Sequence, residues 1–257
     1  GSTAAGLHIA QICASRMARY TMELGGKSAA IVLEDYDAGD FAASAAPLIT
    51  AMTGQVCINY SRVLVPRKRH SEIVESLACA MAAIPVGDPL DPATYMGPLA
   101  MERQQEKVLG YIEKGRVAGA TLVTGGARPA GLNRGFYVEP TLFANASNDM
   151  AIAQEEIFGP VSTVIPYDNE EEAIALANAS EYGLSGGVYT NDTDHAYAVA
   201  RRIRTGTFTQ NGRDFDVTNP FGGFKKSGTG RELGVEGMEA YTETKTVFLP
   251  KLPSHLT

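Results

Sequence analysis

The run Ala29-Ala30-Ile31-Val32-Leu33 decides the fold, because it is apolar at every position. A strand that is covered by helices on both faces has this pattern, whereas a strand with one wet face alternates apolar and polar residues. An Ala-rich helix is expected from Asp40 to about Met52, with a kink at Pro47. The next short strand is expected at Arg62-Val63-Leu64-Val65, where three apolar residues follow an arginine. The order strand, helix, strand is typical of an α/β domain.

The same alternation continues along the chain. Further helices are expected over residues 4–17, 72–81, 101–117, 170–179 and 194–204, and further strands over 20–24, 121–123, 161–165, 187–189 and 207–209. Strands that alternate with helices of this length indicate a mostly parallel sheet. We see no internal repeat and no low-complexity segment in the sequence.

Bulk composition narrows the class of protein. The 257 residues suffice for one large domain or two small ones, and 44% hydrophobic with 20% charged residues is ordinary for a globular protein. The net charge of −7 gives no electrostatic footprint for nucleic acid. No apolar run approaches the roughly 20 residues that a membrane span needs. Three cysteines indicate no disulfide framework, so we expect a cytoplasmic protein. From the charge and the apolar runs we expect no nucleic-acid partner and no membrane partner.

Metal binding is not expected either. The histidines are His8, His70, His195 and His255, and they are scattered without metal-ligand spacing.

Chemistry is indicated by a cysteine and a glutamate. Cys57 lies in the segment Gly54–Arg62, which reads GQVCINYSR, and Glu23 lies 34 residues upstream in the segment Met22–Ser28, which reads MELGGKS. A thiolate can attack an electrophilic carbon, and a carboxylate can activate the water that frees the product. Most single cysteines in intracellular domains are instead small buried hydrophobic residues. We assign that role to Cys13 and Cys79, and we expect Cys57 to be the reactive thiol.

These two segments together resemble the active site of the aldehyde dehydrogenase superfamily. Its members carry E-L-G-G-K and G-Q-x-C-x-x-x-x-R in this order and at about this distance. Two further segments are similar to family motifs: Glu155–Pro160 matches E-E-I-F-G-P, and Asn219–Gly228 resembles P-F-G-G-x-K-x-S-G. The resemblance covers nearly every residue from Gly1 to about Leu249.

The resemblance implies a role for each matching residue. Cys57 would add to the aldehyde carbon, and Glu23 would activate water. Glu156 would hold the hydroxyls of the nicotinamide ribose, and Phe158 would pack beside the nicotinamide. The further residues implied are Gly1, Ser2 and Leu24 at the cofactor, and Phe215 and Phe221 in a tunnel for a small aldehyde substrate.

The first six residues, GSTAAG, resemble the G-S-T-x-x-G turn that lies late in the family's cofactor-binding domain. This match implies that the chain is the C-terminal half of a longer protein. The implied fold is a three-layer α/β catalytic domain with a mostly parallel sheet over residues 26–225. A remnant of the Rossmann-like NAD(P)-binding domain would occupy residues 1–25, and a C-terminal segment with an oligomerisation strand would occupy residues 226–257.

The segment Thr242–Leu249 is rich in residues that favour strands, and Pro250 ends it. An exposed edge strand is a template for pairing with another chain. The family builds dimers and tetramers by strand pairing, so this segment predicts a homodimer or homotetramer. The alternative is a strand that closes its own sheet.

The function implied is oxidation of an aldehyde to a carboxylic acid with NAD or NADP, through a cysteine thiohemiacetal and a thioester. A missing N-terminal half would supply most of the cofactor-binding sheet, so the choice between NAD and NADP stays open. For the same reason we expect the chain alone to be weakly active or inactive. A non-redox module is the alternative, either a thiol esterase fragment or an oligomerising interaction domain.

Overall fold

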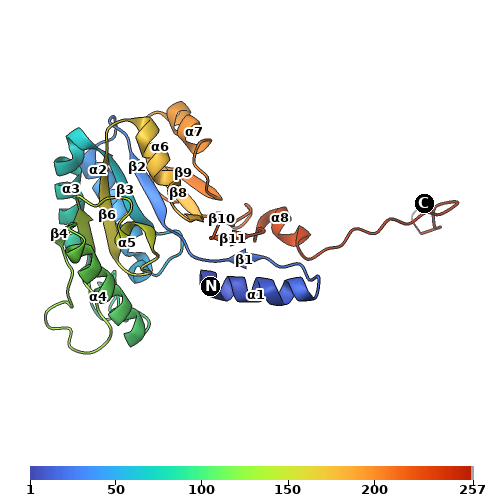
Figure 1. Cartoon of the computed structure of the whole chain (residues 1–257), viewed down its shortest axis with the longest axis horizontal. Helices are drawn as coiled ribbons and strands as arrows, with labels where there is room; N and C mark the ends of the chain where they lie inside the picture. The colour runs from blue at the N-terminus through green and yellow to red at the C-terminus, as the bar shows by residue number, and fades with distance from the viewer. Residues whose placement is uncertain (256–257) are drawn as a thin grey trace.

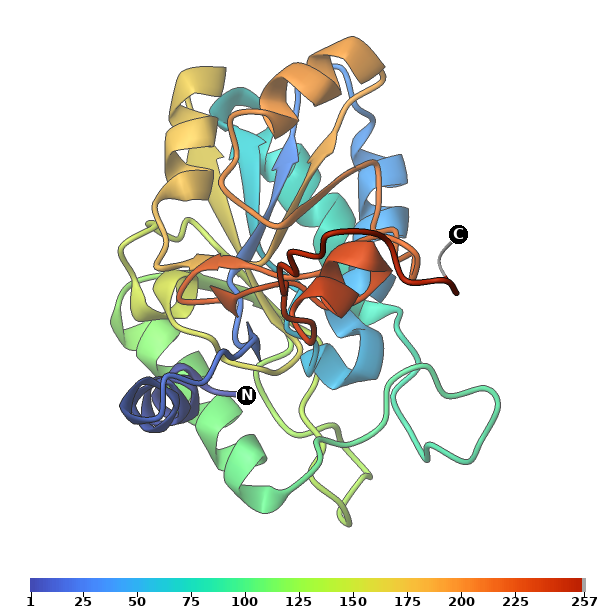
Figure 2. The ribbon, with the colours of Figure 1, turned by 90° about the vertical axis from the view of Figure 1, so that its right-hand side faces the viewer.

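The computed structural model describes residues 1–255, which form a seven-stranded sheet with helices on both faces (Figure 1, Figure 2). In spatial order the strands are β4 (Thr121–Thr124), β5 (Thr141–Ala144), β6 (Val161–Tyr167), β3 (Tyr60–Pro66), β2 (Ser28–Val32), β8 (Ser185–Tyr189) and β9 (Thr207–Gln210). Neighbouring strands run parallel except at the edge, where β4 is antiparallel to β5. The prediction of a mostly parallel α/β fold is therefore confirmed.

Two helical layers cover the sheet. The covering helices are α2 (Ala38–Thr50), α3 (His70–Ala82), α4 (Glu102–Val117), α5 (Ala151–Gln154), α6 (Glu170–Asn178) and α7 (Thr193–Ala200). Helices α2 and α3 pack on one face, where Phe41 and Leu77 are buried against Val63 of β3. The other four pack on the opposite face, where Val108 and Ile174 are buried. Every residue of β2 is buried, as its continuous apolar run predicts.

Local sequence explains where α2 begins. Asp37 caps its N-terminus, because its carboxylate accepts hydrogen bonds from the N–H groups of Gly39 and Asp40 at 2.7 and 2.9 Å. Pro47 lies inside the helix, as the sequence predicts. Two short 3₁₀ segments, η1 (Ala51–Gly54) and η2 (Arg67–Arg69), follow α2 and β3. The sequence analysis did not place β5 or α5, each of which has four residues.

Parallel strand order gathers the candidate residues at one edge. Glu23 precedes β2, Cys57 precedes β3, and Glu156 precedes β6. These three strands are neighbours in the sheet and run parallel, so their amino ends lie side by side. Residues far apart in sequence are thereby brought to one site.

A smaller unit lies beyond this edge. It consists of α1 (Thr3–Ser15), β1 (Met22–Glu23), β7 (Tyr182–Gly183), β10 (Phe224–Lys225), β11 (Gly228–Thr229) and α8 (Gly234–Glu239). Strand β11 pairs with β1, and Gly228 approaches so closely that a Cβ there would lie 1.9 Å from the carbonyl oxygen of Met22. This pairing holds the C-terminal part of the chain beside Glu23.

Helix α1 stands apart from the sheet (Figure 1). Gly6 packs against Leu24, but Leu7, Ile9 and Ile12 are 61%, 49% and 48% exposed. The expectation that Cys13 is buried in an apolar stripe is therefore wrong, and its side chain is half-buried. The division into segments 1–25, 26–225 and 226–257 stays a prediction.

The C-terminal residues run away from the body as an arm (Figure 1). Residues 242–249 join no strand within the part of the chain that the structure describes, so they do not close its sheet. Arg19 forms an ion pair with Glu243 at 2.7 Å at the base of the arm. Phe248 is 93% exposed. Pairing of this segment with a second copy stays a prediction.

Candidate active site

A cavity of about 660 Å³ lies where the amino ends of β2, β3 and β6 meet. Eight of the nine site residues expected from the sequence line it: Gly1, Ser2, Glu23, Leu24, Cys57, Glu156, Phe158 and Phe221. The ninth, Phe215, lines a second cavity instead. The sequence motifs therefore converge on one place in the fold.

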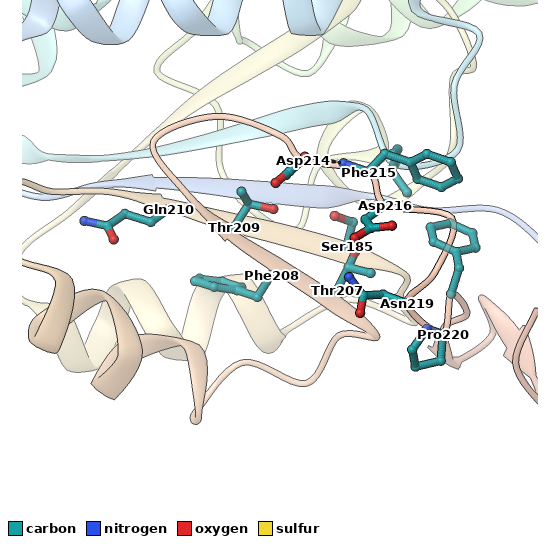
Figure 3. Close-up of a pocket in the computed structure, with 12 residues that line it drawn as sticks. Ser185, Thr207, Phe208, Thr209, Gln210, Asp214, Phe215, Asp216, Asn219 and Pro220 are labelled. Atoms are coloured by element: carbon teal, nitrogen blue, oxygen red, sulfur yellow. Dashed lines mark hydrogen bonds between the residues drawn. The ribbon is translucent and has the colours of Figure 1, made fainter. Parts of the chain in front are cut away.

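The second cavity measures about 360 Å³ and is shown in Figure 3. Ile58 lines it next to Cys57 in sequence, and Phe221 lines both cavities. The rings of Phe215 and Phe221 meet edge to face, with their centroids 5.8 Å apart. The two cavities thus lie on either side of Phe221, with the Cys57–Ile58 step between them. One can receive a cofactor and the other a small apolar carbonyl compound.

An unusual backbone presents Cys57. Met52, Thr53 and Gly54 have φ values of 50°, 59° and 67°, in the left-handed region that non-glycine residues rarely adopt. A Cβ on Gly54 would lie 2.1 Å from the carbonyl oxygen of Gly159, so the chain needs glycine there. The turn therefore packs directly on the segment that carries Phe158.

The Cys57 thiol is half-buried, and burial raises its pKa above the ordinary value. The negative charges of Glu23 and Glu156 raise that pKa further, while backbone N–H groups lower it. Cys79 is exposed on α3, so the expectation that it is buried is wrong. Because Cys79 is exposed, its thiol competes with that of Cys57 for alkylating reagents, and preferential labelling of Cys57 stays a prediction.

Glu23 has the environment of a general base. Both of its carboxylate oxygens are buried without a hydrogen-bond partner among residues 1–255. Burial raises the pKa of Glu23 to about 7, and repulsion by Glu232 adds to this, while Arg231 lowers it. A base with a pKa near neutrality accepts and returns a proton efficiently at physiological pH. The repulsive partner, Glu232, lines the same cavity, where its backbone forms an antiparallel bridge with Phe221.

Glu156 is held in a cradle of glycine backbone. Its Oε1 accepts a hydrogen bond of 3.0 Å from the N–H of Gly26, and a Cβ on Gly25 would lie 2.5 Å from its Oε2. Burial raises the pKa of Glu156, while the Gly26 N–H, Lys107 and Lys27 lower it. The pair of carboxylate oxygens can accept two hydroxyl donors from a vicinal diol.

The remaining cofactor candidates also suit a nicotinamide ribose and its pyrophosphate. Phe158 has a φ of 59° and is 36% exposed beside the cavity. Ser2 caps α1 by accepting a hydrogen bond from the N–H of Ala5 at 3.2 Å, so the helix N-terminus faces the cavity. Helix N-termini favour anions. The residues present therefore fit part of a dinucleotide.

A buried network behind the site was not found from sequence. Arg62, the last residue of the cysteine segment, is 2% exposed and donates hydrogen bonds to the carbonyls of Lys27, Leu176 and Ala177. Lys27 is also 2% exposed, and its Nζ has no hydrogen-bond partner within the described chain. Burial lowers the pKa of Lys27 to about 7, and Arg62 adds to this, while Glu156 raises it. The sequence signal that could have identified both residues is their place in the two motif segments, Lys27 in Met22–Ser28 and Arg62 in Gly54–Arg62.

Comparison with known proteins is decisive at this point. The model of the aldehyde dehydrogenase family matches residues 1–247. The chain belongs to the aldehyde dehydrogenase family. A geranial dehydrogenase from Castellaniella defragrans is 48% identical over 249 residues, which are 97% of this chain and 52% of that protein. A betaine aldehyde dehydrogenase from Rhizobium leguminosarum is 46% identical over 251 residues.

Solved aldehyde dehydrogenase structures give the same result. The Mycobacterium tuberculosis enzyme, determined with NAD+, has a TM-score of 0.94 and 50% sequence identity, and the match covers 97% of this chain and 52% of that one. A Bacillus cereus aldehyde dehydrogenase, also with NAD+, has a TM-score of 0.93 and 42% identity. The chain spans about half the length of the relatives it matches.

Residues 1–255 contain neither a membrane-spanning helix nor a cluster of metal ligands. None of the helices there is long and apolar enough to cross a membrane. Within the same residues, no group of three or more His, Cys, Asp or Glu side chains is arranged to hold a metal ion.

Proposed function

We propose that this aldehyde dehydrogenase chain carries the catalytic half of an NAD-dependent aldehyde oxidation, with Cys57 as nucleophile and Glu23 as general base. The observation that carries the proposal is the shared cavity, which both side chains line together with Glu156 and Phe158. The 46–48% identity to two aldehyde-oxidising relatives supports the reaction class.

In the first step Cys57 must act as a thiolate. Its Sγ adds to the aldehyde carbon, and the carbonyl electrons move to the oxygen, which gives a tetrahedral thiohemiacetal anion. The backbone N–H of Cys57 is a candidate donor to that oxygen. Phe215 and Phe221 would hold the apolar part of the aldehyde in the second cavity, and Ile58 would pack against it.

A nicotinamide bound there would supply the hydride acceptor, and loss of the hydride would turn the thiohemiacetal into a thioester. Glu156 would accept the ribose hydroxyls, and Phe158 would pack beside the ring. Leu24, Gly1 and Ser2 would face the rest of the cofactor at the N-terminus of α1. Solved relatives bound to NAD+ favour NAD over NADP.

Glu23 acts last. Its carboxylate takes a proton from water, the resulting hydroxide adds to the thioester carbon, and the C–S bond breaks to release the carboxylic acid and the Cys57 thiolate. Because the pKa of Glu23 is about 7, the fraction of carboxylate rises as the pH passes through neutrality. The deacylation rate should follow that rise.

The arm of residues 242–255 supports a proposal about assembly. Val247, Phe248, Leu249 and Leu252 are each more than half exposed, which is costly for a monomer. Residues 242–249 also favour strands in their sequence. Pairing of this segment with a second copy would cover these side chains and give a homodimer or homotetramer.

Acylation by p-nitrophenyl acetate tests the proposed site without requiring hydride transfer. Peptide mass mapping should place the acetyl group on Cys57, and NAD+ with an aldehyde should produce NADH when this chain is part of the whole enzyme. Steady ester turnover, with no NADH formed by the whole enzyme, would favour the non-redox thiol esterase. Acetylation confined to Cys13 or Cys79 would contradict the assignment of the nucleophile.

A further inference from the structure

The nucleophile turn is held in a backbone conformation that its own sequence disfavours. Met52 and Thr53 both have positive φ, at 50° and 59°. Thr53 is β-branched, and such a residue in the left-handed region is a genuine outlier that persists only when its surroundings enforce it. Since Cys57 follows this turn, whatever enforces it also aims the thiol.

Residues 95–100, which we call the strap, form three hydrogen bonds: one to helix α2 before the turn, one to Thr53 in the turn and one to Gln55 just after it. The Tyr95 hydroxyl donates to the carbonyl of Pro47 at 3.0 Å, before the turn begins. The Thr53 hydroxyl lies 3.1 Å from the carbonyl oxygen of Gly97. The Gln55 side-chain oxygen accepts a hydrogen bond of 3.1 Å from the N–H of Ala100. The three hydrogen bonds follow the same order along the strap and along residues 47–55.

The strap is itself fixed to the core. Met96 is fully buried and Leu99 is 2% exposed. The Met96 N–H donates to the carbonyl of Pro85 at 2.9 Å, and the Leu99 N–H donates to that of Phe136 at 3.0 Å. The strap can therefore transmit the rigidity of the core to the turn.

We infer that Thr53 is a positioning residue, which acts through its bond to the strap to keep the Cys57 turn left-handed and the thiol half-buried. The inference rests on the proposed function, because it concerns the nucleophile of that site. Thr53 touches neither cavity, so its effect passes through the backbone to Cys57.

A hydroxyl deletion separates this role from general stability. Thr53→Val keeps the side-chain shape and removes the bond to the strap, and Thr53→Ser restores the hydroxyl. Thr50→Val is the matched control, because Thr50 is fully buried and donates within its own helix to the carbonyl of Ala46 at 2.8 Å. Tyr95→Phe removes another bond of the strap at a side chain that is 47% exposed, where folding is not at risk.

Two readouts are measured on the full chain: amide hydrogen exchange over residues 51–59, and the pH midpoint of Cys57 alkylation by iodoacetamide. Loss of one hydrogen bond should speed exchange in Thr53→Val about tenfold in this segment alone. The Cys57 midpoint should fall toward the ordinary thiol value as burial is relaxed. Thr53→Ser should behave as wild type, and Tyr95→Phe should change in the same direction as Thr53→Val.

Equal changes in Thr53→Val and Thr50→Val would overturn the inference, as would no change in Thr53→Val. If Thr53→Val does not fold, Tyr95→Phe provides the test: amide hydrogen exchange over residues 51–59 equal to that of wild type would overturn the inference. The proposed function fails separately, through a Cys57 that ester reagents never acylate. Such a result would leave the exchange measurements and their meaning for the turn intact.

Discussion

Gly54→Ala should destabilise the chain, because an added Cβ meets fixed backbone at a residue whose φ is positive. An added Cβ meets the carbonyl oxygen of Gly159 at 2.1 Å and its carbon at 2.2 Å, and neither is the end of a flexible side chain. The residue also has a φ of 67°. Two separate penalties therefore act at one position.

Two control glycines separate the penalties. Gly110 lies inside α4 with nothing within 4 Å of its added Cβ and an ordinary φ. Gly110→Ala should stabilise the chain by about 0.5–1 kcal/mol through helix propensity. Gly119 also has nothing within 4 Å, but its φ is 89°. Gly119→Ala should cost about 1 kcal/mol, which is the backbone penalty alone.

Gly54→Ala adds overpacking against fixed backbone, which costs about 1–3 kcal/mol, to that backbone penalty. The total is about 2–4 kcal/mol. Urea unfolding followed by far-ultraviolet circular dichroism gives the free energy of unfolding for all three variants. The reasoning is refuted if Gly54→Ala costs no more than Gly119→Ala.

Three further predictions concern charge and assembly. Lys27→Met removes a buried amine whose pKa is lowered to about 7 in the folded chain. Between pH 7 and 10.5 the unfolded chain binds the extra proton, so the free energy of unfolding of wild type should rise relative to that of the variant, by up to about 1.4 kcal/mol per pH unit. Urea midpoints of the two proteins that stay parallel across this range would contradict the prediction. Glu232→Gln removes a charge that raises the pKa of Glu23, so the rise of deacetylation rate with pH should move to lower pH, and an unmoved profile would exclude the coupling. Phe248→Asp should lower the mass measured by light scattering, whereas Glu239→Asp should not, and an unchanged mass in Phe248→Asp would count against pairing through the arm.

Much of the fold follows from local pattern, because apolar runs report which faces a strand buries. The run Ala29–Leu33 correctly placed a strand covered on both sides. The candidate residues Cys57 and Glu23 came from motifs, and the parallel order of β2 and β3 explains why they meet. The buried strand and the two candidate residues could be predicted because each depends on a short segment of sequence.

Features that depend on tertiary contact were not predictable. Glu232, which raises the pKa of Glu23, is held at the cavity by an isolated backbone bridge to Phe221, and no local sequence pattern predicts such a bridge. Cys79 lies in an Ala-rich stretch of α3, where alanines on both faces hide which side is buried. The strand expected at Thr242–Leu249 pairs with nothing in the described chain, since a strand needs a partner.

The lifetime of an acetyl group on Cys57 tests the central claim most directly. After a brief exposure to p-nitrophenyl acetate at pH 8, mass spectrometry follows loss of the acetyl group from the Cys57 peptide in wild type and in Glu23→Gln. An amide cannot take a proton from water, so the acetyl group should persist about 10²-fold longer in the variant. Equal lifetimes in the two proteins would contradict the assignment of Glu23 as the base that frees Cys57.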